Sequence, residues 1–408
     1  MILPKVGSCE WLADELAQAR LLERPQAQQL VRRFRAEEPF GDSPEFAEFL
    51  VRQGVLTAYQ AQRALDGEAR NLVLGAYIVI ELLGPGSMGT VYSAIGRADR
   101  RTYAIKVLPL RNQWNVRLVR KQVQAFERLP PHDAVAPFMD VGTAGKVHYL
   151  VWPFVEGKTI EELVSSGGPL RTADIARLGI QLAEALQHGH THGIVHGLLK
   201  PTNVIVGYDG QARIVDFGIG SLLAENPDDI HGLVDTCSQA LTTAGMLECA
   251  SPELVLDPAH LTPEGDQYSL GCVLYFATTG SYPYPGGTAM DKVVAHQKLK
   301  PTPIWNLNRE APRPLVAVIE RLMHKAPADR YRRVDEVIHD LTPLAGSGLT
   351  MVPPPVPADI RTPPPKFRLR IGRVQPAAPT PADSPPPTPQ TPAQPQRRGW
   401  LGRLFGRE

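Results

Sequence analysis

The feature that most constrains the fold is a change of hydrophobic pattern near Gly157. Before this residue, short runs such as YAIKVLPL and VHYLVWPFV are rich in β-branched and aromatic residues and are bounded by glycine and charged turns, which is typical of an antiparallel sheet. After it, long stretches such as TADIARLGIQLAEALQHGH repeat their apolar residues at helical spacing. The sequence therefore predicts an α+β chain with a β-rich lobe over 74–155 and an α-rich lobe over 156–345.

A helical period also marks residues 1–70. Runs such as WLADELAQARLL and EFAEFLVRQGVL place apolar residues three and four positions apart. Pro25 is expected to open one helix, and Ser43 with Pro44 to open another in the N-cap and first-turn positions. Because these runs offer no convergent polar cluster, we expect a small helical module that packs against the rest of the chain and has no catalytic role.

Beyond residue 345 the composition shifts to proline. Residues 346–396 contain segments such as SPPPTPQTPAQPQ, with few groups able to build a core, so a disordered tether that leans toward polyproline II is predicted. Residues 397–408 read RRGWLGRLFGRE, in which apolar side chains share a face among arginines. This terminal segment is expected either to contact a membrane surface or a protein partner, or to remain a solvated tail.

The charge balance and the cysteines limit the classes of partner. Lysine and arginine number 43 against 42 acidic residues, which gives no net attraction to nucleic acid. The cysteines form no C-x-x-C pair, which argues against a disulfide framework and favours a reducing compartment. No apolar run is long enough to cross a bilayer, and the first residues lack a secretory signal pattern. We therefore expect a soluble, cytoplasmic protein.

A glycine turn and a strand lysine indicate a phosphate site. LLGPGSMGTVY places Gly84, Gly86 and Gly89 in a G-x-G-x-x-G pattern between two strands, where the absence of Cβ atoms lets a phosphate approach the backbone amides. Val91 follows on the next strand, and Lys106 lies in the otherwise apolar strand YAIKVL, where an ammonium group needs an anion. Each feature alone also fits an ordinary turn or a solvent-facing lysine. Together they predict a nucleotide phosphate site.

Two further stretches supply oxygen ligands for a hard cation. HGLLKPTN carries Lys200 and Asn203, and IVDFG carries Asp216 directly after a β-type run. An asparagine and an aspartate in this order can both offer oxygens to Mg²⁺, which binds together with nucleotide phosphates. The ordered set of glycine turn, strand lysine, His-to-Asn loop, DFG and SPE is highly specific.

This ordered set resembles that of the Hanks-type serine/threonine protein kinases of bacteria, over about residues 74–344. The resemblance implies a bilobal protein kinase-like fold over 74–345, with ATP and Mg²⁺ as the cofactors. It also implies that Glu253 of SPE closes the activation segment, that Asp266 is the helix aspartate of the α-rich lobe, and that Arg330 pairs with Glu253. These three residues are structural in the family.

The resemblance also assigns an adenine site. Val91 and Ala104 would cover the base from above and Ile205 from below, while the backbone of Val155 in the linker LVWPFVEG would hydrogen-bond it. Trp152 takes the gatekeeper position, where a bulky indole would narrow the rear of the pocket.

The catalytic loop departs from the family pattern. The family reads His-Arg-Asp where this chain reads His196, Gly197 and Leu198, so the proton-accepting aspartate is missing although Lys200 is retained. No catalytic base is therefore assigned in this loop.

Two other family residues are also replaced. The helix after Lys106 offers Gln122 where the family has a glutamate that pairs with the lysine, and Glu127 lies more than a turn beyond it. Before SPE, Met246 and Cys249 replace a threonine and a tyrosine.

These features favour a pseudokinase, which binds ATP with or without Mg²⁺ and acts as a regulator or scaffold for an unidentified protein partner. The first alternative is a weakly active serine/threonine kinase that transfers the γ-phosphate without a dedicated base. Positioned base catalysis contributes about 10²- to 10⁴-fold, so its loss leaves slow chemistry open. The second alternative is a scaffold whose pocket is filled by Trp152.

Overall fold

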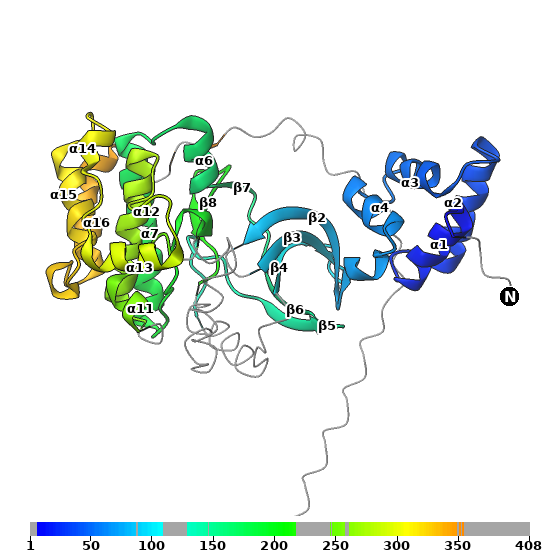
Figure 1. The fold of residues 1–408 in the computed structure, drawn as a ribbon, viewed down its shortest axis with the longest axis horizontal. Coiled ribbons are helices and arrows are strands. Elements are labelled where there is room, and N and C mark those ends of the chain that lie inside the picture. The colour runs from blue at the N-terminus through cyan, green and yellow to red at the C-terminus, as the bar shows by residue number, and fades with distance from the viewer. Residues whose placement is uncertain are drawn as a thin grey trace, which may run out of the picture. The chain divides into compact units, whose positions relative to one another are not determined.

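The computed structural model describes residues 6–86, 89–108, 129–145, 147–217, 245, 247–257, 261–348, 351 and 353–354. The predicted helix that carries Gln122 and Glu127, together with Met246, most of the predicted tether and the whole terminal segment, lies outside these residues. The described part contains N-terminal helices, a curved sheet and a region rich in helices (Figure 1).

The N-terminal module consists of short helices whose starts are fixed by local side chains. Pro25 lies in the first turn of its helix, as predicted. Ser43 is the first helical residue and not the N-cap: Asp42 takes that position, and its backbone N–H donates to the Glu45 carboxylate at 3.0 Å. The elements are α1 (Cys9–Gln18), α2 (Arg24–Glu37), α3 (Ser43–Arg52), α4 (Ala58–Leu65) and η1 (Ala69–Leu72).

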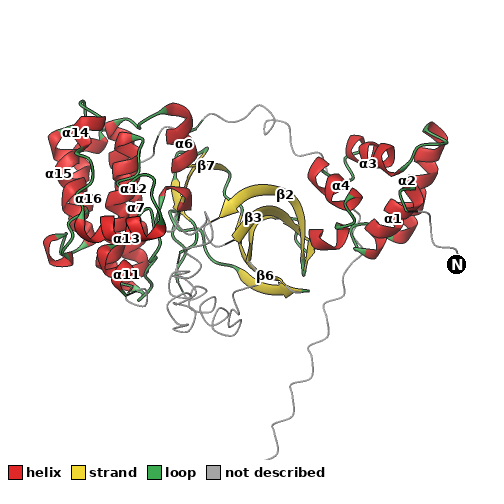
Figure 2. Cartoon of the chain, viewed as in Figure 1, coloured by secondary structure: helices red, strands yellow, loops and turns green. Residues whose placement is uncertain are grey.

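A six-stranded antiparallel sheet follows, in the spatial order β1-β2-β3-β4-β6-β5. Side chains alternate between its faces: Leu150 and Trp152 on β6 join the core of the helical lobe, whereas Tyr149 and Val151 join the core beneath the N-terminal helices. Side chains on both faces of the sheet therefore contribute to a hydrophobic core. Figure 2 shows the strands of this sheet as yellow arrows. The strands are β1 (Val73–Leu74), β2 (Tyr77–Gly86), β3 (Gly89–Gly96), β4 (Thr102–Leu108), β5 (Asp140–Ala144) and β6 (Val147–Pro153).

The N-terminal helices and the sheet share one hydrophobic core. Phe34 and Phe46, whose ring centroids are 5.1 Å apart, belong to the same buried cluster as Ile105 of β4. Two polar contacts from the start of α4 also reach β2. Gln60, which is buried, donates to the Val79 carbonyl at 2.6 Å, and the Thr57 hydroxyl donates to the Ile80 carbonyl at 2.6 Å. The helical module and the β-rich lobe therefore pack together around one core.

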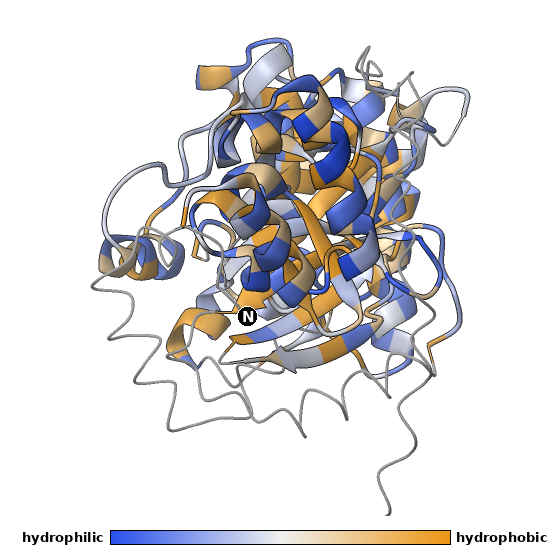
Figure 3. Ribbon diagram, turned by 90° about the vertical axis from the view of Figure 1, so that its right-hand side faces the viewer, coloured by the Kyte–Doolittle hydropathy of each residue, from blue (hydrophilic) through white to orange (hydrophobic). Residues whose placement is uncertain are grey.

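The α-rich lobe is built around α12 (Pro263–Thr279), in which every residue from Asp266 to Thr279 is buried. A helix that is apolar on all sides is typical of the centre of a domain. Figure 3 shows hydrophobic and hydrophilic residues alternating along the helices of the chain. The other elements are β7 (Gly157–Thr159), α6 (Ile160–Gly167), α7 (Thr172–Thr191), η2 (Pro201–Asn203), β8 (Val204–Gly207), β9 (Ala212–Ile214), α11 (Pro252–Leu256), α13 (Ala289–Lys298), α14 (Ile304–Leu307), α15 (Arg313–Leu322), η3 (Pro327–Asp329) and α16 (Val334–Ala345).

None of the described helices combines the length and apolarity required to cross a lipid bilayer.

The shared core predicts that a defect in α4 destabilises the β-rich lobe. The change Gln60→Leu would leave the buried Val79 carbonyl without its donor, so we expect a loss of about 1–3 kcal/mol in the free energy of unfolding. Gln62→Leu on the exposed side of the same helix is the matched control and should change it by less than about 0.5 kcal/mol. Urea denaturation measures both. Equal losses would show that the Gln60 contact does not hold the module to the sheet.

Candidate functional site

The glycine turn lies directly above the strand lysine. Gly84 pairs with Val91 and Gly86 with Gly89 across β2 and β3, and Val91 pairs in turn with Lys106 on β4. A Cβ atom added to Gly86 would come within 2.9 Å of a Val91 methyl and 3.3 Å of Lys106 Cε. A side chain at residue 86 would therefore intrude on the lysine. Residues 87 and 88 at the tip of the turn lie outside the described part.

Lys106, Asp216 and Asn203 form a buried polar cluster that joins the two lobes. Lys106 Nζ and Asp216 Oδ2 form an ion pair, and the side chains are only 5% and 12% exposed. Asn203 Nδ2 donates to the same carboxylate oxygen at 2.7 Å. The backbone of Asp216 has a φ of 61°, in the left-handed region that non-glycine residues rarely adopt and that is often found at functional sites. Three residues from separate motifs are thus brought together.

The donor set of this cluster fits Mg²⁺ when nucleotide phosphates complete the shell. The amide of Asn203 and the carboxylate of Asp216 are hydrogen-bonded neighbours, so both can present oxygen to one ion. Among the described residues, no group of three or more histidine, cysteine or acidic side chains is arranged to hold a metal alone. Nucleotide phosphates and water would complete the shell of a Mg²⁺ ion held by Asn203 and Asp216.

Leu198 occupies the centre of the catalytic loop as a half-buried side chain packed against the hydrophobic core of the α-rich lobe. Residues 196–203 contain no carboxylate. The loop is held from below by Asp266, whose carboxylate accepts the backbone N–H groups of His196 and Gly197 at 2.8 Å each. Gly197, with a φ of 77°, stands where the family has an arginine. The loop therefore keeps the support of its backbone although the arginine and the aspartate of the family are replaced by Gly197 and Leu198.

His196 is a neutral structural residue. It is fully buried, and burial lowers the pKa of its imidazole. Its Nε2 lies 3.1 Å from the Val215 carbonyl, while Nδ1 accepts the Leu198 N–H at 3.2 Å, which places the ring proton on Nε2. The Phe217 ring meets it edge-on at 5.4 Å between centroids. These contacts place the side chain after Asp216 in the core of the α-rich lobe.

Lys200 is retained, but its side chain is bound by a backbone carbonyl of the same chain. Its ammonium donates to the Gly245 carbonyl at 3.0 Å, and burial together with the nearby Lys106 charge lowers its pKa. Cys249, at the position of the missing tyrosine, is buried, and burial raises the pKa of its thiol.

Trp152 fills the space behind the cluster. It pairs across the sheet with Ala104, and its ring lies 5.1 Å from that of Phe138. Lys106 Nζ lies 5.5 Å from the indole centroid, within the range of a cation–π interaction. The buried Trp152 Nε1 has no hydrogen-bond partner among the residues that the structure describes.

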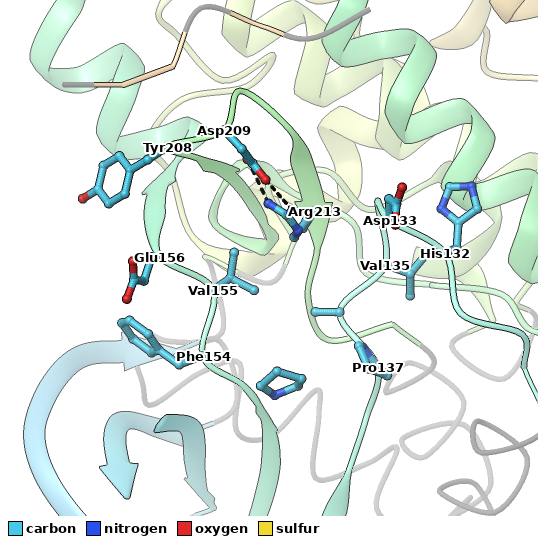
Figure 4. A pocket seen from close by; sticks show the side chains of 12 residues that line it. His132, Asp133, Val135, Pro137, Phe154, Val155, Glu156, Tyr208, Asp209 and Arg213 are labelled. Carbon is cyan, nitrogen blue, oxygen red and sulfur yellow. Dashed lines mark hydrogen bonds and ion pairs between the residues drawn. The ribbon is translucent and has the colours of Figure 1, made fainter. Parts of the chain in front are cut away.

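The other predicted adenine residues lie on different elements. Val91 is on β3, Ala104 is on β4, and Ile205 is on β8, where it pairs with Thr159 of β7. The linker residue Val155 lines a separate cavity, and that cavity's lining includes none of the other predicted site residues (Figure 4). Residue spacing contains no signal for this cavity, because three segments distant along the chain form it.

The predicted pair of Glu253 and Arg330 is confirmed. The two guanidinium nitrogens reach the two carboxylate oxygens at 2.6 and 2.9 Å, and the arginine side chain is fully buried. Burial alone would raise the pKa of Glu253, but the Arg330 hydrogen bonds hold it below its usual range. This pair anchors the end of the activation segment.

Breaking the pair should destabilise the fold in a pH-dependent way. Arg330→Met leaves the buried Glu253 carboxylate without its cation, so we expect a loss of about 3–5 kcal/mol at pH 7. Because the pair depresses the carboxyl pKa, its contribution is present at neutral pH and fades as the pH falls through the titration of Glu253. Unfolding at pH 7 and pH 4 measures the loss.

Arg333→Met, which removes the exposed partner of Asp335, is the control and should cost less than about 1 kcal/mol. A loss for Arg330→Met that is equally large at both pH values would contradict the electrostatic account.

Comparison with known proteins agrees with this geometry. Residues 77–341 match the family model described as the protein kinase domain. A probable serine/threonine-protein kinase of Clostridium perfringens is 32% identical over 268 residues, which are 65% of this chain and 38% of that protein. The serine/threonine-protein kinase PrkC of Bacillus subtilis is 26% identical over 272 residues, which are 66% of this chain and 40% of that protein.

The fold also matches a solved structure. The crystal structure of the PknI kinase domain of Mycobacterium tuberculosis superposes with a TM-score of 0.52 at 21% identity and covers 67% of this chain and 98% of that domain. The chain spans only 38% and 40% of the lengths of the two curated relatives above. The chain belongs to the protein kinase domain family, in the group of Hanks-type serine/threonine kinases of bacteria.

Proposed function

We propose that this kinase-fold chain is a pseudokinase, which binds ATP and acts as a regulator or scaffold for a protein partner. The observation that carries the proposal is Leu198: a hydrocarbon packed against the lobe core stands where the family has the acid that receives the substrate hydroxyl proton. We further propose that it acts in the cytoplasm without binding nucleic acid. The division into 1–70, 74–345, 346–396 and 397–408 remains our proposed domain organisation, with membrane contact by the last segment as one role for it.

Two acids near the loop are already engaged in other contacts within the described part of the chain. Asp266 accepts two backbone N–H groups from beneath the loop, and Asp216 is engaged by Lys106 and Asn203. Loss of a positioned base costs about 10²- to 10⁴-fold in rate. Typical kinases turn over roughly 1 to 100 times per second, so this loss alone would leave slow transfer. The absence of the loop arginine and of the docking hydroxyl at Met246 lowers the rate further.

The nucleotide side of the site supports ATP binding. Gly84, Gly86 and Gly89 leave room for phosphates beside the backbone, and Lys106 would exchange its contact with Asp216 for them. Asn203 and Asp216 would hold Mg²⁺, which would neutralise phosphate charge. Family members normally use both cofactors.

A weakly active serine/threonine kinase is the second candidate. It is favoured by the intact cluster of Lys106, Asn203 and Asp216, because phosphoryl transfer depends mostly on positioning and on charge neutralisation. The two candidates differ in whether any phosphate leaves ATP for protein.

One preparation distinguishes them. We expect the purified chain to melt at a higher temperature with ATP and Mg²⁺, because a ligand that binds only the folded state stabilises it by about 2.7 kcal/mol at one hundred times its Kd. Incubation with γ-labelled ATP and a generic protein substrate should transfer no label above the background of the double variant Lys106→Ala, Asp216→Ala. The double change removes both partners of the ion pair together, so neither is left as an unpaired buried charge.

Label transfer by the native chain that the double variant abolishes would establish the weakly active kinase. The absence of a thermal shift with ATP would instead favour the scaffold with a filled pocket.

The indole of Trp152 should limit the affinity for ATP. Trp152→Met removes volume at the rear of the site together with the unpartnered indole N–H, so we expect ATP to bind up to about tenfold tighter, or about 1.4 kcal/mol. Isothermal titration calorimetry measures the Kd directly and separates affinity from the change in fold stability. Trp305→Met on α14, where the indole is 41% exposed, is the control and should leave the Kd unchanged. An unaltered Kd in Trp152→Met would show that the indole does not restrict the pocket.

A further inference from the structure

A cavity of about 540 Å³ lies at the linker between the lobes. Three segments form it: residues 132–137 before β5, residues 153–156 at the end of β6 and directly after it, and the β8–β9 region with Tyr208, Asp209 and Arg213 (Figure 4). It includes none of Lys106, Asn203 and Asp216, and the one residue that it shares with the predicted adenine site is Val155.

The lining combines an apolar surface with negative charge. Val135, Pro137, Pro153, Phe154 and Val155 supply the apolar part, and Tyr208 adds an aromatic ring. Three exposed carboxylates border it, from Asp133, Glu156 and Asp209.

The positive groups of the lining do not cancel this charge. Arg213 is held by Asp209, with its nearest nitrogen 2.6 Å from a carboxylate oxygen (Figure 4). His132 is neutral at pH 7, because burial and the neighbouring His188 lower its pKa. Two carboxylates, those of Asp133 and Glu156, therefore remain for a cationic ligand.

The C-terminal part of the chain arrives at the edge of this cavity. After α16, Arg177 donates to the carbonyls of Ser347 and Gly348 at 3.3 and 3.2 Å. The Met351 N–H then donates to the Gly210 carbonyl at 2.9 Å, and the Met351 side chain is only 4% exposed. Gly210 follows Asp209 directly, and Pro354 is also buried. The chain is thus fixed beside the cavity at the point where residue 355 begins.

The next sixteen residues have the composition that such a cavity would bind. Residues 355–370 read PVPADIRTPPPKFRLR, with five prolines, four basic residues and one acid. Proline-rich segments favour the extended polyproline II helix, which rises about 3.1 Å per residue and docks in grooves lined with aromatic side chains. A few residues of such a helix are enough to reach this cavity, because its lining residue Asp209 is the direct neighbour of Gly210, which Met351 contacts.

We propose that residues 355–370 dock into this cavity, with prolines against its apolar and aromatic lining and with basic side chains toward Asp133 and Glu156. Docking adds a tether between the C-terminal part of the chain and the linker that joins the lobes. The inference uses no residue of the nucleotide cluster and holds whether or not the chain transfers phosphate.

The full-length chain provides the test. Trypsin cleaves after Arg361, Lys366, Arg368 and Arg370, and cleavage of a docked segment follows the population of its released form. The double variant Asp133→Lys, Glu156→Lys reverses the charge of the rim, so we expect cleavage at these sites to accelerate about tenfold. The double variant Glu310→Lys, Glu320→Lys makes the same charge change on exposed residues outside the cavity lining and should cleave at the native rate.

Two further measurements identify the contact. Adding Arg361→Glu and Arg368→Glu to the variant with the reversed rim charge places opposite charges together again. Cleavage at Lys366 and Arg370 should therefore become slow again. A carbodiimide should join Lys366, the only lysine in the segment, to Asp133 or Glu156 within one chain, and Lys366→Gln should remove this cross-link.

Equal cleavage rates in the native chain and the reversed rim, or no cross-link, would overturn the proposal. Cross-links between isotopically light and heavy copies would overturn it in favour of docking onto a second chain.

Discussion

The buried carboxylate of Asp266 supports the candidate site. It lies on α12, the helix buried on all sides, and accepts the backbone N–H groups of two successive residues of the catalytic loop at 2.8 Å each. A further contact of this carboxylate, with His190 Nε2 at 2.8 Å, is to α7 and not to the loop. Because Asp266 holds the loop only through backbone N–H groups, the loop keeps its path whatever side chain follows His196. This explains how residue 198 can change from an acid to a leucine while Asn203 and Lys200 remain in place.

The second important interaction is the ion pair between Lys106 and Asp216 at the candidate nucleotide site. An ammonium and a carboxylate that are both nearly buried stabilise each other only while they are in contact, and each would be costly alone. Phosphates and a divalent cation would offer each partner a replacement of opposite charge. Trp152 and Phe138 pack behind this pair and reduce the room for such an exchange.

The sequence predicted the parts of this architecture that depend on local pattern or on motif. The change from strand to helix near Gly157, the proline in the first turn of α2 and the Glu253–Arg330 pair are all found as expected. The pair of Ser43 and Pro44 predicts Ser43 as the cap of α3, but the preceding Asp42 makes the capping contacts. Such shifts of one residue depend on side-chain geometry that spacing does not contain.

Contacts between distant segments could not be read from spacing. The contact of Lys200 with the Gly245 carbonyl, the merging of the N-terminal helices with the core of the sheet, and the cavity at the linker each join parts of the chain that are far apart in sequence. The left-handed backbone at Gly197 has a consequence for the history of the loop. A side chain there would bear about 1–2 kcal/mol of strain, which glycine avoids. Under the proposed pseudokinase function, this replacement gives the loop a more relaxed backbone, and a return to arginine would have to bear that strain again.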